Sequence, residues 1–193
     1  MIAPEHLTAI VTAVDVPEAM LKVCTPDWWR AFLRTLHFTG MRRGEALGLR
    51  WTSIDSSKNA IKVLAKTSKS RRTRILPQCD HLMPVLIAWR QCSPSLELVF
   101  PLPVNERSGK TKDARVIFYD WERIQLAAGI ERADQYDFQD FRSTCATELL
   151  EAGWLVPAVK DWLGHAKSST VLERYYANTI RSLASMGAQR RVV

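Results

Sequence analysis

The chain has 193 residues, of which 47% are hydrophobic and 24% are charged, as in an ordinary globular protein. This composition excludes a largely disordered chain, a collagen-like repeat and a disulfide-dense miniprotein. Lys and Arg number 27 against 20 Asp and Glu, and the resulting net charge of +7 favours polyanionic partners, most commonly nucleic acid.

The first twenty residues and the four cysteines indicate the cellular compartment. The N-terminal segment contains acidic residues and no basic cluster, so it is not a signal peptide. No uncharged stretch approaches the roughly 20 apolar residues of a membrane-spanning helix. Cys24, Cys79, Cys92 and Cys145 form no Cys-x-x-Cys pair and no disulfide framework. We therefore expect reduced thiols in a cytoplasmic protein with no membrane partner.

Helices dominate the expected secondary structure. Apolar residues recur at helical spacing in most segments, and Pro4 and Asp27 stand where two of the helices begin. A break at Thr39-Gly40 ends the second helix. The predicted helices are 4–14, 27–39, 42–50, 79–91, 113–128, 138–152, 156–163 and 169–177.

Between the third and fourth helices the pattern changes to that of strands. Segments 51–55, 60–65 and 72–76 are predicted as strands, and the first two are joined by the turn-rich segment 56–59. Residues 93–112 are rich in Pro, Ser, Asn and Gly and are predicted as a loop. The expected fold is mainly α with a small antiparallel β-sheet, which is an α+β class.

The first chemical motif is TGMRRGE at residues 39–45. A glycine before a helix start permits a tight turn, which places Arg42 at the helix entrance, and Arg42 and Glu45 share a helix face. Backbone N–H groups at a helix start favour anions, and arginine adds a planar fork suited to phosphate. The alternative is an ordinary surface ion pair.

The second motif is the basic run KTSKSRRTR at residues 66–74, between two predicted strands. A hairpin tip that carries five basic side chains repels itself unless a polyanion neutralises it. The alternative is a solvated hairpin, which is the usual meaning of a charge run.

Two further motifs lie in the C-terminal half. Residues 139–153, QDFRSTCATELLEAG, form a predicted helix with Arg142 in its first turn, where an anion is favourable. The sequence WLGH at 162–165 is followed by RYYAN at 174–178. Taken singly, a histidine at a helix end is more often a cap, and a tyrosine pair is more often part of a core.

In combination the four motifs are far more specific than any one of them. They give TGxRxxE, a strand-borne lysine, a helix-borne arginine followed two places on by threonine, LGH, and tyrosine. This order resembles the catalytic domain of the tyrosine recombinases, the phage-integrase family of site-specific DNA recombinases, from about Pro4 to Asn178. The resemblance implies the fold of that domain and DNA strand cleavage and rejoining through a 3′-phosphotyrosyl intermediate.

The resemblance also implies roles for matching residues. The first arginine of the family is similar to Arg42, and the acidic residue after it to Glu45. The lysine of the family's β-hairpin is similar to Lys66. The second arginine corresponds to Arg142, and the later histidine to His165.

The implied nucleophile is one of two adjacent tyrosines. Family members place it about nine or ten residues after the LGH histidine, and Tyr175 lies ten residues after His165. The family's Tyr-small-His ending instead resembles Tyr176-Ala177-Asn178. We favour Tyr175 and keep Tyr176 as the alternative nucleophile.

Gln139 and Ser143 depart from the family pattern. Gln139 stands three positions before Arg142, where the family usually has His or sometimes Lys. An amide can donate a hydrogen bond to phosphate but cannot transfer a proton. Ser143 stands where a second His is common. We assign Gln139 a supporting position.

The implied chemistry needs no cofactor and no metal ion. A phenol oxygen attacks the phosphodiester in line, while Arg42, Arg142 and His165 hold the negatively charged oxygens of the transition state. Lys66 is the candidate that protonates the leaving 5′-oxygen. Glu45 orients Arg42, because a carboxylate aimed at phosphate would be repelled.

The expected partner is double-stranded DNA, with the protein associated with the nucleoid when bound. On DNA the family generally works as a homotetramer, whereas an isolated domain can be monomeric. The residues expected to contact DNA are basic and come from the hairpin and the third helix: Lys69, Arg71, Arg72, Arg74 and Arg43.

The expected domain organisation is a catalytic domain and a short tail. We assign residues 1–178 to the catalytic domain and 179–193 to a C-terminal tail that is exchanged with a neighbouring protomer. The N-terminal DNA-clamping domain of the family is expected to be absent. The chain is then either an excised catalytic fragment or a minimal recombinase.

Two other functions could use the same motifs. Type IB topoisomerases share the constellation, and relaxation of supercoils without exchange between duplexes would identify one. A DNA-binding module without catalysis is the second, with Gln139 as the sign of a decayed site. The presence of both arginines, the lysine, the histidine and a tyrosine argues against that module.

Overall fold

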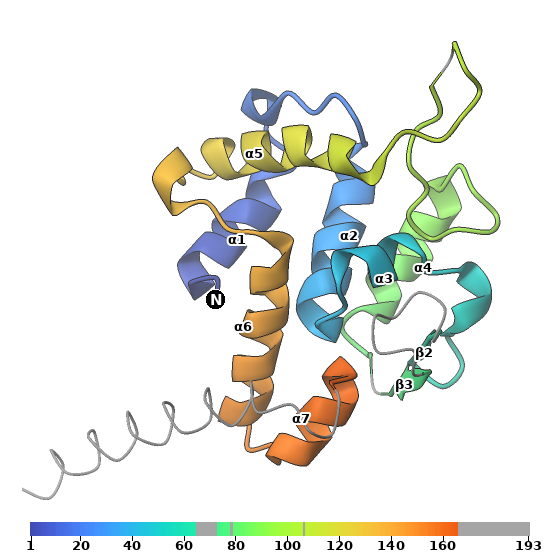
Figure 1. The fold of residues 1–193 in the computed structure, drawn as a ribbon, viewed down its shortest axis with the longest axis vertical. Helices are drawn as coiled ribbons and strands as arrows, with labels where there is room; N and C mark the ends of the chain where they lie inside the picture. Colours follow the sequence, from blue (N-terminus) through green and yellow to red (C-terminus); the bar gives the residue numbers. More distant parts are fainter. Residues whose placement is uncertain (65–72, 78, 106, 166–193) are drawn as a thin grey trace, which may run out of the picture.

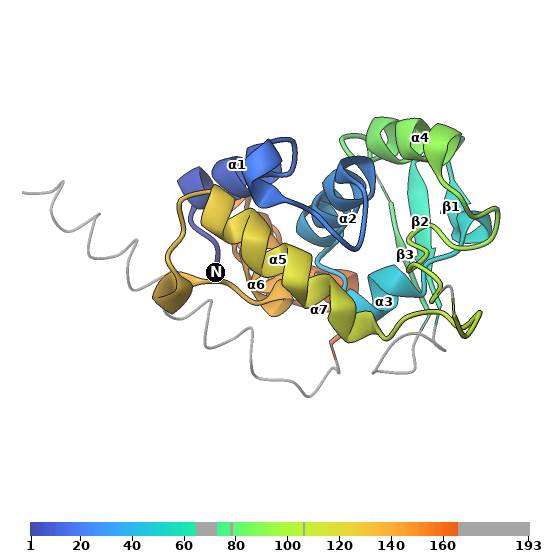
Figure 2. The same ribbon diagram turned by 90° about the horizontal axis from the view of Figure 1, so that it is seen from above.

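The computed structural model describes residues 1–64, 73–77, 79–105 and 107–165 (Figure 1 and Figure 2). The predicted helix 169–177 lies outside these residues. The α-helices of the described chain are α1 (Pro4–Ala13), α2 (Pro26–Thr39), α3 (Arg43–Leu47), α4 (Met83–Cys92), α5 (Ile117–Ala127), α6 (Phe138–Glu151) and α7 (Val156–Leu163). The strands are β1 (Ile54–Asp55), β2 (Ala60–Val63) and β3 (Arg74–Leu76), and short 3₁₀ helices are η1 (Pro17–Ala19), η2 (Trp51–Ser53), η3 (Ala114–Val116) and η4 (Arg132–Asp134).

Helix α2 runs through the middle of the molecule (Figure 1). It begins at Pro26, one residue earlier than predicted, because proline suits the first helical position and Thr25 caps the helix by accepting from the Trp28 nitrogen at 3.3 Å. It ends at Gly40, whose φ of 59° is left-handed. The helix therefore stops where the predicted Thr39-Gly40 break lies.

Aromatic side chains form the centre of the main core. Trp28 and Phe32 of α2 stack with ring centroids 4.5 Å apart, and Trp121 of α5 stacks on Phe138 of α6 at 5.0 Å. Trp29 of α2 joins the two groups, because its ring lies 6.4 Å from that of Trp121. Aromatic burial of this extent makes a rigid support for the ends of the helices.

The sheet has the order β1-β2-β3 and is antiparallel throughout, as predicted. In its register Ile54 pairs with Ile61, and Ile61 pairs with Leu76. Alternate residues of β3 face the interior, so Arg74 and Leu76 are buried while Ile75 between them is 65% exposed. An arginine thus takes the inward position and an isoleucine the outward one.

Several element boundaries differ from the sequence prediction. Helices α4 and α5 begin at Met83 and Ile117, four residues after the predicted starts at 79 and 113, and β2 ends at Val63 instead of at 65. The segments around α3 and β1 differ more. Of the predicted helix 42–50, only Arg43–Leu47 is helical, as α3, because the helix ends at Gly48. Arg50 instead forms a β-bridge with Leu98, which lies in the loop after α4. The predicted strand 51–55 opens as the 3₁₀ helix η2, in which the buried Trp51 indole donates to the Ser95 carbonyl at 3.0 Å. Tertiary hydrogen bonding outweighs local propensity at both places.

Helix α7 lies between α6 and the sheet (Figure 1). Its apolar side chains pack with the C-terminal half of α6 in a second, smaller core that includes Cys145, Leu150, Val159 and Leu163. A side chain at Gly40 would overlap Leu163 and lie 3.1 Å from the Cys145 sulfur. The ends of α2 and α7 therefore approach each other as closely as glycine allows.

All four cysteines are free thiols, and burial raises the pKa of Cys145 to about 12. No helix in the described ranges is long and apolar enough to cross a membrane. Within those same ranges, no group of His, Cys, Asp and Glu is arranged to hold a metal ion.

Candidate active site

The carboxylate of Glu45 in α3 lies at the centre of the candidate site. Glu45 is only 1% exposed, although glutamate is ordinarily a surface residue. Its Oε2 accepts from the Arg42 backbone nitrogen at 3.0 Å and from Nη2 of Arg74 at 2.8 Å. Its Oε1 accepts from Nη1 of Arg42 at 3.4 Å and from Nη1 of Arg74 at 3.3 Å. Two arginines therefore compensate the buried negative charge.

Arg42 occupies the N-cap position at the start of α3, which is the helix entrance that the motif predicts. Its ion pair with Glu45 spans three residues on one side of the short helix, and its side chain is 29% exposed. Because Glu45 binds both the backbone and the guanidinium of Arg42, the arginine is anchored at two points. Part of the guanidinium stays open to an incoming anion.

Arg142 joins the ends of two helices. It is buried in α6, where Nη1 donates to the Gly40 carbonyl at 2.8 Å and Nη2 donates to the Leu163 carbonyl at 2.5 Å. Burial, and then the positive charge of Arg42, lower the pKa of Arg142 to about 9, which still leaves the guanidinium charged at neutral pH. Arg142 thus brings positive charge into the interior and braces the ends of α2 and α7.

His165 follows α7 directly. Gly164 ends that helix in a left-handed conformation with φ of 68°, and the His165 nitrogen donates to the Lys160 carbonyl at 2.9 Å. Burial, and then Arg142 and Arg42, lower the pKa of the half-buried His165 to about 4. The imidazole is therefore neutral at pH 7 in the absence of an anion.

Arg74 occupies a different position from the one its motif suggests. The sequence places it among the hairpin cations that contact DNA, yet its side chain is only 8% exposed and pairs with Glu45. The cause is strand alternation, which turns Arg74 inward beside the site. Contact with DNA stays a prediction for this residue. The alternation of residues along β3 places Arg74 and Ile75 on opposite faces of the sheet. Hydropathy predicts that Ile75 faces inward and Arg74 outward, which is the reverse of the structure.

Three buried nitrogens of the site have no hydrogen-bond partner among the described residues. They are Nε of Arg74, Nε of Arg142 and Nδ1 of His165. A buried polar group without a partner costs about 1–3 kcal/mol, so such groups are rare unless a ligand uses them. The two arginine nitrogens can donate to a bound oxyanion, and Nδ1 of His165 can do so in the tautomer that carries its proton on that nitrogen.

Gln139 and Arg43 are close to the site residues along the chain. Gln139 is exposed in the first turn of α6, one turn before Arg142. Arg43 is half-buried in α3, and its guanidinium lies 4.7 Å from the centre of the Phe118 ring of α5. This cation–π contact links α3 to α5 and holds Arg43 beside Arg42.

The structure brings together the residues of three predicted motifs: Arg42 and Glu45, Arg142, and His165. It adds Arg74 from the basic run at 66–74, in an unexpected orientation. Other predicted site residues lie outside the described part of the chain, and their roles stay predictions: Lys66, Lys69, Arg71, Arg72, Tyr175 and Tyr176.

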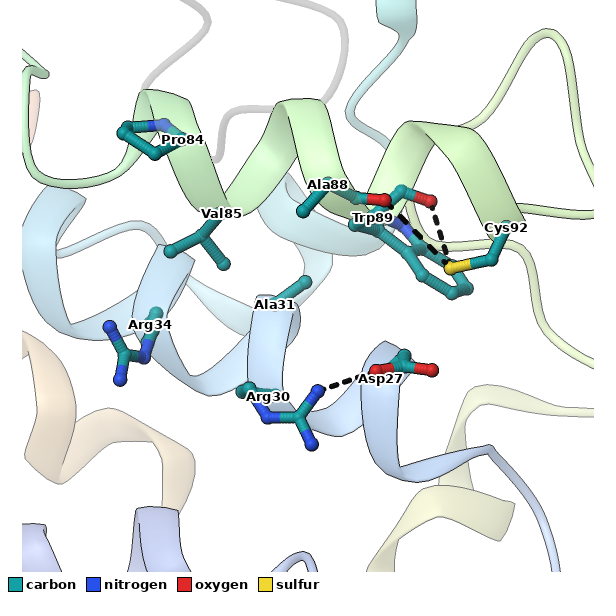
Figure 3. A pocket seen from close by; sticks show the side chains of 9 residues that line it. All are labelled: Asp27, Arg30, Ala31, Arg34, Pro84, Val85, Ala88, Trp89 and Cys92. Atoms are coloured by element: carbon teal, nitrogen blue, oxygen red, sulfur yellow. Dashed lines mark hydrogen bonds and ion pairs between the residues drawn. The ribbon is translucent and has the colours of Figure 1, made fainter.

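Surface grooves elsewhere are lined by other residues. A groove of about 360 Å³ lies between α2 and α4, with Arg30 and Arg34 on one wall and Val85, Ala88 and Trp89 on the other (Figure 3). None of Arg42, Glu45, Arg142 and His165 is among the residues that line it. This groove is therefore separate from the candidate site.

Comparison with known proteins identifies the family of the chain. The model of the phage integrase family matches residues 2–181. The chain belongs to the phage integrase family. The resemblance inferred from the four motifs is thereby confirmed, and so is the expected fold, mainly helical with a small antiparallel sheet.

Curated members of the phage integrase family resemble most of the chain. Tyrosine recombinase XerC of Nitrobacter winogradskyi is 30% identical over 171 residues, which cover 86% of this chain and 52% of that protein. XerC of Xylella fastidiosa is 27% identical over 98% of this chain and 66% of its own length. The chain thus spans about half to two thirds of the curated relatives it matches.

Solved structures of the phage integrase family share the fold. The XerA recombinase has a TM-score of 0.69 at 21% identity, covering all of this chain and 63% of that one. The catalytic core of lambda integrase has a TM-score of 0.59 at 19% identity, covering 87% of this chain and 92% of that one. The described elements therefore have the arrangement of a recombinase catalytic core.

Proposed function

We propose that this chain is the catalytic domain of a tyrosine-type site-specific recombinase that cleaves and rejoins double-stranded DNA. The observation that carries the proposal is the convergence of Arg42, Arg142 and His165, with a buried nitrogen on each of the last two that has no partner among the described residues. Similarity to XerC recombinases and to lambda integrase structures bound to DNA supports it.

The proposed reaction exchanges one phosphodiester for another. The phenol oxygen of Tyr175, or alternatively Tyr176, attacks the scissile phosphorus and forms a 3′-phosphotyrosyl bond as the 5′-oxygen leaves. The phenol releases its proton to solvent as it attacks, Lys66 gives its proton to the departing 5′-oxygen, and both proton transfers run in reverse in the second step. A 5′-hydroxyl from another strand then attacks the phosphotyrosyl bond and releases the tyrosine. The bond energy is conserved, so the reaction balances without an outside energy source.

In this proposal the described cations stabilise the transition state. Extra negative charge develops on the two non-bridging oxygens of the phosphate as the tyrosine attacks. Arg42 offers an open guanidinium, and Arg142 and His165 offer the buried nitrogens that have no partner among the described residues. Donors fixed in a partly desolvated site act strongly because little reorganisation is needed during the reaction.

We further propose that residues 1–178 act as the catalytic domain, with residues 179–193 contacting a neighbouring protomer in a homotetramer on DNA. A lambda integrase tetramer bound to a Holliday junction is among the similar structures, and it supports this assembly. The proposed site of action is the nucleoid. The type IB topoisomerase alternative is less favoured, because the relatives of the chain are recombinases.

The test is covalent capture on nicked DNA. A pool of duplexes with randomised sequence, each nicked near its centre, loses a short fragment after cleavage and traps the protein–DNA adduct. We expect wild-type protein to form an adduct that survives denaturation, and Arg42→Gln to form it roughly 100- to 1,000-fold more slowly. Arg132→Gln is the control, because Arg132 is 75% exposed and pairs with Glu122 outside the site.

Selected duplexes then separate the enzyme classes. We expect strand exchange between two duplexes that carry the captured sequence. Relaxation of a supercoiled plasmid without exchange would establish the topoisomerase alternative. Binding without any adduct in folded wild-type protein would contradict the proposed catalysis and favour a DNA-binding module.

A further inference from the structure

Arg74 is placed where an apolar side chain would be expected. Its strand position pairs with Val63, and its neighbours on the inward face, Val63 of β2 and Leu76 of β3, are buried hydrophobic residues. A buried guanidinium carries a large desolvation cost unless it is well paired. The buried charge therefore requires an ion-pair partner, and Glu45 is that partner.

The contact between Arg74 and Glu45 has the geometry of a two-point clamp. Nη2 lies 2.8 Å from Oε2, and Nη1 lies 3.3 Å from Oε1. The same two oxygens accept from the backbone and guanidinium of Arg42. Because a planar guanidinium fixes both carboxylate oxygens, Arg74 determines how Glu45 presents its remaining acceptor positions to Arg42.

Arg74 also packs against the turn that carries His165. A Cβ built on Gly164 would lie 2.8 Å from Nη1 of Arg74 and 3.2 Å from its Cδ and Cζ. Only glycine admits the guanidinium at this distance, and Gly164 has a left-handed φ of 68° as well. The guanidinium thus contacts the turn on one side and Glu45 on the other.

We propose that Arg74 is a positioning residue. It orients Arg42 through Glu45, and it fixes the position of the Gly164–His165 turn by packing against Gly164. This inference rests on the proposed function for its effect on cleavage, while its effect on His165 is independent of that function. Arg74 works by holding groups that contact phosphate, and its own charge adds to the field around the imidazole.

Three Arg74 variants separate its charge from its shape. Arg74→Met removes the charge and the clamp, and Arg74→Lys keeps the charge but loses the two-point geometry. Arg74→Met could unfold the domain by leaving Glu45 buried with fewer cations, so the double variant Arg74→Met with Glu45→Gln removes both charges together. Arg132→Met, at an exposed ion pair, is the matched control.

The first measurement is the NMR titration of the His165 imidazole in the free protein. The charged groups around it are Arg142, Arg42, Lys160 and Arg74, all of which disfavour its protonation. We expect Arg74→Met to move the titration midpoint upward, and Arg74→Lys and Arg132→Met to leave it near the wild-type value. An unchanged midpoint in Arg74→Met, and in the double variant, would overturn the placement of Arg74 beside His165.

The second measurement is single-turnover cleavage of the nicked duplex. We expect Arg74→Met and Arg74→Lys to lower the cleavage rate by roughly 10- to 100-fold with DNA affinity unchanged, because misplaced groups reduce catalysis more than binding. Weaker affinity alone, with a flatter salt dependence, would show that Arg74 is a DNA contact and overturn the inference.

A third comparison tests the turn itself. Gly164→Ala introduces strain and displaces Arg74, whereas Gly153→Ala introduces comparable strain at φ of 86° where no atom lies within 4 Å of the new Cβ. We expect the midpoint of the His165 NMR titration to shift in Gly164→Ala and to stay at the wild-type value in Gly153→Ala. If wild-type protein forms no adduct, the proposed function fails, and the His165 midpoints alone decide the role of Arg74.

Discussion

His165 is surrounded by positive charge from four parts of the chain. Arg142 of α6, Arg42 at the start of α3, Lys160 of α7 and Arg74 of β3 all oppose protonation of its imidazole, and burial opposes it further. A neutral imidazole donates one hydrogen bond and accepts one. A phosphate bound among these cations would offset their charge and raise the pKa of His165, so anion binding and proton uptake are expected to be coupled.

The first prediction concerns the stability of the protein in acid. The folded-state pKa of His165 is lowered to about 4, below the value of 6.5 for an ordinary histidine. The unfolded chain therefore takes up this proton first, and the stability contributed by the neutral imidazole is lost as the pH falls from about 6.5 to about 4. We expect the unfolding free energy of wild type, relative to His165→Gln, to decrease across that window and to be constant above it.

Urea denaturation of both proteins at pH 7.5, 5.5 and 4 measures this difference. The comparison cancels the contributions of the other histidines and the carboxylates, since both proteins contain them. A difference that stays constant across the window would mean that His165 titrates with an ordinary pKa and does not lie among the four cations.

At the scale of elements, the close approach of α2 and α7 gives the second prediction. Gly40→Ala places a methyl group against Leu163 and Cys145 and forces a left-handed residue to carry a side chain. The strain costs about 1–2 kcal/mol, and overpacking adds roughly 1–3 kcal/mol. We expect thermal or urea unfolding to show the sum of both costs.

Gly129→Ala is the control for this prediction. Gly129 also has a left-handed φ, of 78°, but nothing lies within 4 Å of its new Cβ, so only the strain cost applies. Equal destabilisation of the two variants would show that the ends of α2 and α7 do not pack as closely as described.

The basic run gives the third prediction. Replacing Lys69, Arg71 and Arg72 with Gln removes three charges, and we expect weaker binding to DNA of any sequence. The slope of log affinity against log salt concentration should fall by about one unit for each DNA phosphate that the variant no longer neutralises. Filter binding across a salt series measures that slope, and an unchanged slope would show that these side chains are merely solvated.

Helices could be predicted from the sequence where apolar residues recur at helical spacing over a long segment and Pro, Asp or Gly marks its ends. Helices α1, α2, α6 and α7 begin and end within one residue of the predicted ranges. The boundaries around α3 and β1 differ because the indole of Trp51 and the backbone of Arg50 bond to a loop more than forty residues away along the chain. Local pattern contains no information about such partners.

At the scale of the whole molecule, the ordered motifs predicted that Arg42, Arg142 and His165 would share one site. The structure joins them through contacts that no single motif reveals: Arg142 bonds to the carbonyls of Gly40 and Leu163, which lie 102 and 21 residues away in the sequence. The inward turn of Arg74 was not predicted, because a charge run indicates exposed side chains and register depends on the neighbouring strand.

Formation of a phosphotyrosyl bond is tested most directly at Tyr175 and Tyr176. Each Tyr→Phe change removes only the attacking oxygen, so folding and DNA affinity should be preserved. Adjacent helical residues point about 100° apart, so one tyrosine cannot easily replace the other. The measurement is adduct formation on nicked duplex DNA by wild type, Tyr175→Phe, Tyr176→Phe and the double variant.

We expect wild type and Tyr176→Phe to form the adduct, and Tyr175→Phe and the double variant to form none. The reverse result for the single variants would move the nucleophile to Tyr176 and leave the chemistry intact. Adduct formation by the double variant, or none by folded wild-type protein, would contradict the account.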